Sequence, residues 1–533
     1  MKYSIPFLLA VFFPLLMLAQ KEYHVFPEDY KKSPGKSTGD GSLLNPWDLQ
    51  TALNQKNNVV NGGDTIWLHE GVYTGRYISK IESNLTNKFI VVSAYKADNV
   101  VLNGNIQSSL GAVLEVKGAR VIFKNFEITF LGNFNRNMKK ANFKKVDGIN
   151  HASGETCQFI NLSIHDNPGS GIGSWKYTAD TKIIGCYIYN NGYDDSDRGH
   201  GVGIYVQNIS DKNRLIQDCV IFNNYYKGVE IWSATSGTKM EFVKNVILEN
   251  NVLFNNGNPS GVFKDNVIVA SNDKEGINVA KHIVLKDNVL YHNVDFYDKN
   301  NFGNGTSLSL GYIKKAPVQD ITVENNSIIG KNNALNILYA KSLTFKNNLV
   351  YTGYVHFNKP ILDYYTYWHF DNNTYFTRKS SGFRILDGSD YSLSGWNSKF
   401  NLDINSTWHQ VKDFSNNNVL NLSRDIENPN KFRVVLLEKD GHQVRVDFSQ
   451  YGLKKGASYS IYDVENIKKP ISKGTLSNDS LIEFPMDSSE IAKPIGNSKC
   501  IKTPSNFGVF IIEFSQSAEE KKSFFEKLFG WMF

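Results

Sequence analysis

Between residues 248 and 376 the chain writes nearly the same seven residues five times: LENNVLF (248–254), LKDNVLY (285–291), VENNSII (323–329), FKNNLVY (345–351) and FDNNTYF (370–376). Four earlier segments align with these and give one column of positions: Phe126, Leu162, Cys186, Cys219, Asn251, Asn288, Asn326, Asn348 and Asn373. Successive members of the column are 22 to 38 residues apart, and the residue two places later is apolar in almost every case. Alternation of this kind indicates strands with one face turned inward.

The period decides the fold class. A minimum of 22 residues with strand-type alternation is too short for a propeller blade and lacks helical periodicity. It predicts an all-β chain built on a right-handed parallel β-helix, a solenoid whose coils stack on one another. Asn side chains stacked inside can hydrogen-bond to one another, which makes a buried polar column tolerable. Cys186 and Cys219 fall in the same column, where small buried thiols are expected rather than a disulfide.

A second column of strands follows each member of the first and predicts an outward row of polar and aromatic side chains: Asn150, Gly173, Trp175, Tyr205, Gln207, Glu230 and Trp232. The longest insertions all follow the first column, at 133–145, 192–201, 256–263 and 294–305. Insertions at one corner of successive coils stack on one side of a solenoid, which is often its binding side. The sequence therefore predicts a loop-walled groove along the outward row.

The rest of the chain divides around this solenoid. We expect a β-helix with an N-terminal cap over residues 21–395, where GDGSLLNPWDLQTALN (39–54) forms a short capping helix. Short strands between polar turns predict a C-terminal antiparallel β-sandwich over 400–516. Residues 517–533 have apolar residues at helical spacing and predict an amphipathic tail docked on the body.

Export is expected from the first twenty residues. Lys2 precedes an apolar stretch from Ile5 to Leu18, as in a cleaved signal peptide, and no later segment is apolar enough to span a membrane. We therefore expect a secreted or periplasmic monomer. Four cysteines in 533 residues are neither a disulfide scaffold nor a zinc site. A net charge of +6, from 58 Lys and Arg against 52 Asp and Glu, is too weak to indicate nucleic acid but favours an anionic substrate.

The cap segment, the stacked NN pairs and RGHGVGIYVQN (198–208) resemble the right-handed parallel β-helix superfamily of pectate-lyase type. Exported Bacteroidetes members of that superfamily have a similar C-terminal β-sandwich. The resemblance covers roughly residues 23–515 and implies a carbohydrate-active protein, since the superfamily includes polysaccharide lyases, glycoside hydrolases, epimerases and phage tailspikes. The calcium-binding aspartates and the catalytic Arg or Lys motif of pectate lyases are not matched residue by residue.

The groove carries the residues that β-elimination from a uronic acid needs. A cation must neutralise the sugar carboxylate, a base must take the C5 proton, and an acid must protonate the leaving oxygen at C4. We expect Arg198 to clamp the carboxylate, His200 to act as base or acid, and Tyr205 to be its partner, with a phenol activated by a nearby cation. Lys176 and Glu230 are the further catalytic candidates. The product is that of a polysaccharide lyase, or of a dehydratase when the leaving group is a free hydroxyl.

The expected substrate-binding residues surround these: Asn150, His151, Trp175, Asp194, Asp195, Gln207 and Trp232. No cofactor is expected, although Asp194, Asp195 and Asp197 offer carboxylates to Ca²⁺. Two alternatives stay open. A glycoside hydrolase of the same fold would pair Glu230 with one of the three aspartates across the scissile bond. A non-catalytic surface β-helix would bind glycans through Trp175 and Trp232 alone.

Overall fold

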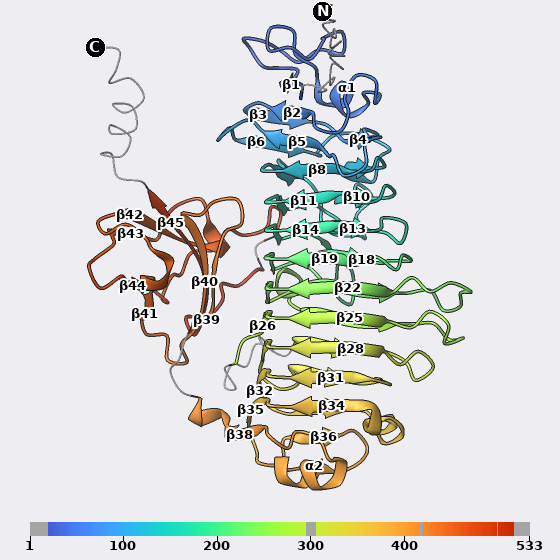
Figure 1. The fold of residues 1–533 in the computed structure, drawn as a ribbon, viewed down its shortest axis with the longest axis vertical. Helices are drawn as coiled ribbons and strands as arrows, with labels where there is room; N and C mark the ends of the chain where they lie inside the picture. The colour runs from blue at the N-terminus through green and yellow to red at the C-terminus, as the bar shows by residue number, and fades with distance from the viewer. Residues whose placement is uncertain (1–19, 295–304, 415–418, 498, 516–533) are drawn as a thin grey trace, which may run out of the picture.

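The computed structural model describes residues 20–294, 305–414, 419–497 and 499–515. Figure 1 shows two parts, a long column of stacked coils and a smaller domain that lies beside it. The predicted leader, apart from its last residue, and the predicted tail at 517–533 lie outside the described residues. No helix in the described ranges is long and apolar enough to cross a membrane.

Each coil gives one strand in turn to sheets A, B and C, and across the described residues each sheet has 12 strands. Sheet A is formed by β1 Glu22–Val25, β2 Thr65–Leu68, β5 Ile90–Ala94, β8 Val121–Lys124, β11 Gln158–Ile160, β14 Lys182–Ile184, β19 Arg214–Gln217, β22 Lys244–Glu249, β25 Lys281–Lys286, β28 Gln319–Glu324, β31 Leu343–Lys346 and β34 Trp368–Asp371. Sheet B is formed by β3 Gly71–Thr74, β6 Val100–Asn103, β9 Glu127–Thr129, β12 Ser163–His165, β15 Tyr187–Tyr189, β20 Val220–Phe222, β23 Val252–Phe254, β26 Val289–Tyr291, β29 Ser327–Ile329, β32 Leu349–Thr352, β35 Thr374–Thr377 and β38 Thr407–Gln410.

Sheet C is formed by β4 Tyr77–Ser79, β7 Ala112–Val116, β10 Asp147–His151, β13 Ile172–Ser174, β18 Ile204–Val206, β21 Val229–Ser233, β24 Val267–Ser271, β27 Leu308–Leu310, β30 Leu335–Ile337, β33 Val355–Phe357, β36 Phe383–Ile385 and β37 Asp390–Tyr391. Neighbouring strands are parallel, except that β37 is antiparallel to β36. The predicted right-handed parallel β-helix is confirmed, and its strands enclose one apolar core.

The NN pairs make the turn from sheet A to sheet B. The first residue of each pair, such as Asn250 or Asn347, is left-handed with φ near 54–57°, a conformation that Asn tolerates better than other side chains. The second residue points inward and bonds to its neighbour one coil away, as in Asn251 Nδ2 to Asn288 Oδ1 at 3.0 Å and Asn288 Nδ2 to Asn326 Oδ1 at 2.9 Å. The first residue of each pair therefore makes the turn, and the second makes the hydrogen bond between coils. The cysteines of this column are buried and free, as expected.

The corner from sheet B to sheet C has its own ladder, which positions the inserted loops. Asn191 Nδ2 donates to Asn224 Oδ1 at 3.1 Å, and Asn224 Nδ2 donates to Asn256 Oδ1 at 3.0 Å. Gly203 packs against this ladder, because a Cβ on it would lie 3.0 Å from Asn224 Nδ2 and 2.5 Å from Ile221 Cγ2. The ladder and Gly203 fix the chain at this corner between Asn191 and Asn256.

Helices close both ends of the column (Figure 1). The expected capping helix is α1 (Leu49–Leu53), whose first turn is capped by the Asp48 carboxylate accepting from the Thr51 N–H at 2.8 Å. At the other end α2 (Leu393–Phe400) places Trp396 on the rings of Phe357 and Phe383. The coils continue beyond the expected boundary at residue 395 as far as β38, because α2 interrupts the repeat inside the last coil and hides it from the sequence pattern.

The C-terminal domain is a small antiparallel sandwich. One sheet contains β39 Val419–Arg424, β40 Lys431–Leu437, β42 Ser458–Asp463, β43 Ser472–Thr475 and β45 Phe507–Ser515, and the other contains β41 Val444–Asp447 and β44 Leu481–Phe484. The face of the five-stranded sheet that is turned away from the two-stranded sheet packs on the outer face of sheet B, where Phe254 and Tyr291 contact Phe507. The sandwich therefore leaves the outer face of sheet C to the corner loops.

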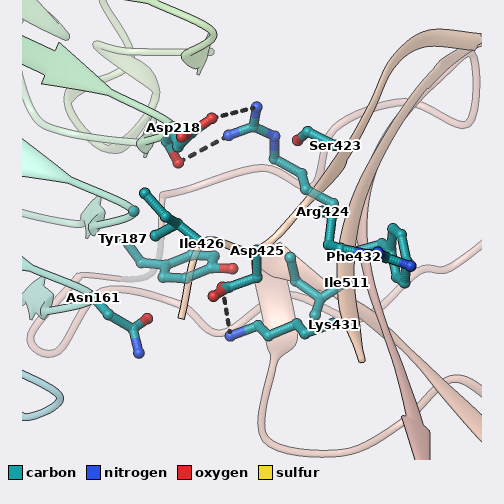
Figure 2. Close-up of a pocket in the computed structure, with 12 residues that line it drawn as sticks. Asn161, Tyr187, Asp218, Ser423, Arg424, Asp425, Ile426, Lys431, Phe432 and Ile511 are labelled. Atoms are coloured by element: carbon teal, nitrogen blue, oxygen red, sulfur yellow. Dashed lines mark hydrogen bonds and ion pairs between the residues drawn. The ribbon is translucent and has the colours of Figure 1, made fainter. Parts of the chain in front are cut away.

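The seam between the two domains is polar where it passes the turns of sheet A (Figure 2). Arg433 is buried there and donates to the backbone oxygens of Asp218 and Asn250 at 2.9 and 2.6 Å, with the Asp218 carboxylate 3.9 Å away. Lys431 pairs with Asp425 at 3.8 Å on the same seam. A buried guanidinium with several acceptors holds the two domains in one relative orientation.

A second connection is the strap, which we define as residues 487–497 and 499–506 between β44 and β45. It runs along the corner between sheets B and C: Ile495 N–H donates to Asp166 Oδ1 at 2.7 Å, and Asn497 Nδ2 donates to the Tyr225 hydroxyl at 2.7 Å. The accessory domain thus reaches the corner loops directly.

Candidate functional site

The outward row predicted for sheet C is present. Asn150, Gly173, Tyr205 and Glu230 are successive partners across β10, β13, β18 and β21. The side chains of Asn150, Tyr205 and Glu230 face outward because the intervening residues, such as Ile204 and Ile231, are buried in the core. The corner loops then lie along one edge of this row.

Two corner loops, 133–145 and 192–201, lie against each other. The Asp194 N–H donates to the Arg136 carbonyl at 2.7 Å, and the Met138 N–H donates to the Asp194 carbonyl at 3.0 Å. The ring of Phe143 contacts that of Tyr193 at 4.7 Å. Within loop 192–201 the short strands β16 (Tyr193–Asp194) and β17 (Gly199–His200) form a hairpin that presents Arg198 and His200.

Arg198 has few protein partners. Its guanidinium carbon lies 4.9 Å from the ring centre of Tyr226, its ion pair with Asp197 is loose at 4.0 Å, and its Nε has no hydrogen-bond partner among the described residues. Arg136, at the same corner, instead donates to the carbonyls of Gly192 and Ile495 at 2.6 Å. Since a guanidinium has five N–H donors, Arg198 has capacity left for a ligand.

His200 stands next to Arg198 in a half-buried position. Its ring stacks on Tyr193 at 5.2 Å, and its Nε2 lies 3.6 Å from Asp195 Oδ2. Burial and then the charge of Arg198 lower the pKa of His200 below its ordinary value, although Asp195 opposes them. The imidazole is therefore neutral at neutral pH and able to accept a proton.

One coil further on lies a buried ion cluster of Lys227, Glu230 and Asp265. Lys227 Nζ is 3.0 Å from Glu230 Oε1 and 3.7 Å from Asp265 Oδ2, and it lies 4.7 Å from the Tyr226 ring centre. Burial opposes its charge, but the two carboxylates outweigh burial and raise the pKa of Lys227. Tyr226 therefore contacts two cations, Arg198 and Lys227.

Tyr205 lies beside Glu230 on the neighbouring strand, and Gln207 Nε2 donates to its hydroxyl at 3.3 Å. Burial and then the charge of Glu230 raise the pKa of Tyr205 to about 12. The expectation of a phenol activated by a cation is therefore wrong, because burial and the Glu230 carboxylate outweigh the opposing charge of Lys227. Tyr205 keeps its proton at neutral pH and is suited to donate it.

Aromatic rings continue the row on both sides of Tyr205. The Trp175 ring is 5.2 Å from the Tyr205 ring, and Trp175 Nε1 donates to Asn150 Oδ1 at 2.6 Å. Trp232 meets Tyr312 edge to face at 4.9 Å. Trp175 keeps 38% of its surface exposed, which suits stacking against a sugar ring.

The acidic residues of loop 192–201 separate into two groups. Asp195, Asp197 and His200 have ligand atoms within 4.8 Å of one another, whereas Asp194 is half-buried at the pairing with loop 133–145. Burial raises the pKa of Asp194. Ca²⁺ takes six to eight oxygen ligands, so two carboxylates with an imidazole are a poor match for it.

Two predicted site residues do not join the others. His151 is fully buried inside the coil, where its Nε2 bonds to the Gly154 carbonyl at 2.9 Å and burial lowers its pKa to about 3. Its assignment to substrate binding is wrong, because strand alternation turns it into the core. Lys176 lies 4.7 Å from the ring of Phe242, past the end of β13 and across sheet C from the corner that carries Arg198.

Three residues of the site were missed in the sequence: Tyr226, Lys227 and Asp265. Tyr226 and Lys227 immediately precede the Gly228 of the second strand column, at the corner that carries Arg198 one coil earlier. Their position at this corner could have marked them as candidate site residues from the sequence alone. The contact of Asp265 with Lys227 depends on how the following coil turns, which spacing alone does not show.

A family model described as the Pel9A-like right-handed β-helix region matches residues 29–301, just over half of the chain. The chain belongs to this Pel9A-like family. The matched region contains every residue of the candidate site. No curated protein matches the chain.

Several solved structures are similar to this Pel9A-like chain. Pectate lyase Pel9A is 17% identical, with 69% of this chain and 78% of that chain covered and a TM-score of 0.40. The alginate lyase from Paenibacillus sp. str. FPU-7 is 18% identical, with 58% and 90% covered and a TM-score of 0.37. The A-module of the mannuronan C-5 epimerase AlgE4 from Azotobacter vinelandii is 15% identical, with 72% and 96% covered and a TM-score of 0.42.

Proposed function

We propose that the protein is an exported enzyme that performs β-elimination on a uronic-acid-containing glycan, at the corner of sheets B and C. The observation that carries this proposal is Arg198, an arginine with unused donors beside the neutral imidazole of His200. A guanidinium placed in this way binds a carboxylate through two parallel hydrogen bonds. Neutralising the carboxylate is the first requirement for making the C5 proton acidic.

We assign the two proton transfers to His200 and Tyr205, in keeping with the directions of their pKa shifts. His200 takes the C5 proton, the electron pair forms the C4=C5 double bond, and the bond from C4 to the leaving oxygen breaks. Tyr205, protonated at neutral pH, gives its proton to that oxygen and is then reprotonated from solvent. Lys227 holds Glu230 beside Tyr205. The leaving group is a sugar in a lyase reaction and water in a dehydratase reaction.

Retaining or inverting hydrolysis is the weaker alternative. It needs a protonated carboxyl group facing a second carboxylate. Glu230 is ion-paired to Lys227 at 3.0 Å, and a carboxylate held by a buried ammonium is a poor proton donor. Glu230 and Asp197 are separated by a row of side chains in contact with one another, Lys227, Tyr226 and Arg198. The two carboxylates therefore do not face each other directly.

The test uses the full-length protein on pectate, alginate, ulvan and glycosaminoglycans, with absorbance in the unsaturated-uronate band as the readout. We expect His200→Ala to lower kcat by roughly 10²–10⁴-fold and Arg198→Ala by roughly 10²–10³-fold. Lys139→Ala, an exposed cation on loop 133–145, is the matched control and should change little. Because the pKa of His200 is lowered from 6.5, the acidic limb of the pH–rate profile should lie below pH 6.5.

Two results would redirect the proposal. New reducing ends without absorbance would indicate a hydrolase. Binding without turnover, weakened by Trp175→Ala and unaffected by His200→Ala, would indicate a glycan-binding β-helix instead.

A further inference from the structure

A pocket lies two to three coils toward the N-terminus from the candidate site, at the same corner of sheets B and C. It has a volume of about 340 Å³, within the range of ligand pockets. Five carboxamide side chains line it: Asn105, Gln107, Asn133, Asn135 and Asn142. We call it the amide pocket. Carboxamides offer both donors and acceptors, which is the pairing that sugar hydroxyls require.

The charge and the aromatic rings of the amide pocket point to an acidic sugar. Lys144 contributes an exposed ammonium, Arg76 contributes a positive charge whose Nε and both Nη groups already donate to backbone carbonyls, and none of the described lining residues is Asp or Glu. Phe130 and Phe134 lie edge to face at 4.9 Å and give the pocket an apolar side. A pyranose that carries a carboxylate presents an apolar face, hydroxyls and one negative charge, and each has a counterpart here.

The pocket is built on fixed structure. Arg76 donates to the carbonyls of Gly104, Ile106 and Leu110 at 3.0, 3.0 and 2.5 Å, which holds the segment 104–110 as one wall. Asn105 Nδ2 donates to the Leu131 carbonyl at 2.6 Å and ties that wall to the next coil. Lys144, on the opposite wall, is exposed.

Loop 133–145 belongs to both the amide pocket and the candidate site. Its Asn133, Asn135, Asn142 and Lys144 line the pocket, whereas its Phe143 contacts Tyr193 of the hairpin that presents His200. The loop carries five cations and no acidic residue: Arg136, Lys139, Lys140, Lys144 and Lys145. Loop 133–145 therefore joins the two places through Lys144 on the pocket and Phe143 on the hairpin.

The spacing of the coils gives the separation. Segment 104–110 precedes β7, loop 133–145 precedes β10, and the hairpin with His200 precedes β18, two to three strands along sheet C. At about 4.8 Å per strand the pocket lies about 10–15 Å from the hairpin. A glycan that runs along the coil axis would need two or three further sugar residues to reach the pocket.

We propose that the amide pocket is a distal subsite that binds one acidic sugar residue of an extended anionic glycan whose reacting residue lies at Arg198 and His200. This inference rests on the proposed function and deepens it: the substrate is an oligomer or polymer of at least three to four sugars, and not an isolated uronate. The pocket selects for chain length.

The test measures binding of size-defined oligogalacturonates and oligoalginates, from dimer to octamer, by calorimetry. The protein is the full-length His200→Ala variant, so that oligomers are not consumed. We expect Lys144→Glu to weaken the binding of tetramers and longer chains about tenfold and to leave dimers unchanged. Gln107→Ala, on the opposite wall, should weaken the same lengths. Lys139→Glu is the control, since it adds the same charge on the same loop outside the pocket.

Three outcomes would overturn the subsite. Equal effects of Lys144→Glu and Lys139→Glu would show general electrostatic attraction only. An equal effect of Lys144→Glu on oligomers of all lengths would contradict a binding site distant from the reacting sugar. If no oligomer binds, the pocket does not bind an acidic sugar. Elimination activity of the protein with His200 intact is measured separately on the same oligomers. Length-dependent binding without elimination would overturn the proposed function and leave the subsite standing.

Discussion

Lys227 is the residue whose role differs most from its appearance in the sequence. A lysine between a tyrosine and a glycine at a turn is normally solvated, yet its side chain is 9% exposed and meets two carboxylates. Arg198, His200 and Tyr205 could be proposed as site residues from the sequence, because they cluster beside one predicted strand. The place of Lys227 at the corner, just before Gly228, was visible in the sequence, but its contact with Asp265 was not, because that partner comes from the next coil.

Replacing Lys227 tests this cluster. Lys227→Met keeps the stem of the side chain but leaves Glu230 and Asp265 without their cation, so we expect a loss of about 3–5 kcal/mol in the free energy of unfolding. Urea denaturation of the variant against the parent measures it.

The double variant Lys227→Met with Glu230→Gln is the matched control, because it removes the uncompensated charge of Glu230 and should recover part of the loss. Equal stability of the parent and the single variant would show that the cluster is solvated and contributes nothing.

At the scale of the coil, the two residues of each NN pair have different structural roles. The first residue of the pair turns the chain in the left-handed region, and the second closes the ladder. Spacing and alternation were enough to predict the ladder and the outward row. The left-handed turn was not predicted, because periodicity reports which face a residue occupies and not its backbone conformation.

Substitution of the first and of the second residue of an NN pair should have different effects on stability. Asn288 accepts from Asn251 and donates to Asn326 and to the Leu248 carbonyl, so Asn288→Ala leaves several buried groups unpaired. We expect a loss of roughly 2–4 kcal/mol. Asn347→Gly, at a left-handed position with φ 57°, should cost little. Chemical denaturation of both variants checks the contrast, and similar losses in the two would contradict it.

At the scale of the molecule, the sandwich and the solenoid form one body. The strands of sheet B written VIF (220–222), VLF (252–254) and VLY (289–291) are apolar on both faces, the mark of a sheet covered on both sides. This signal was present in the sequence. It does not say which domain covers the sheet, and the docking of the sandwich through Phe507 was therefore not predicted.

We expect the two domains to unfold together. Arg433→Ala removes the guanidinium that bonds to Asp218 and Asn250 across the seam, with an expected loss of about 3–5 kcal/mol. Differential scanning calorimetry should show one transition in the parent and a lower Tm in the variant. Arg445→Ala, on an exposed strand of the sandwich, is the control. Two separate transitions in the parent would show that the domains are independent.

The strap has a consequence for the order in which the protein is made. Each coil can stack on the previous one as soon as it has been synthesised, because its ladder partners come from adjacent coils. Arg136 differs, since its Nε partner, the Ile495 carbonyl, is made 359 residues later. The corner that carries His200 is therefore completed among the last parts of the molecule, and a chain that ends before the strap lacks the Ile495 carbonyl that accepts from Arg136.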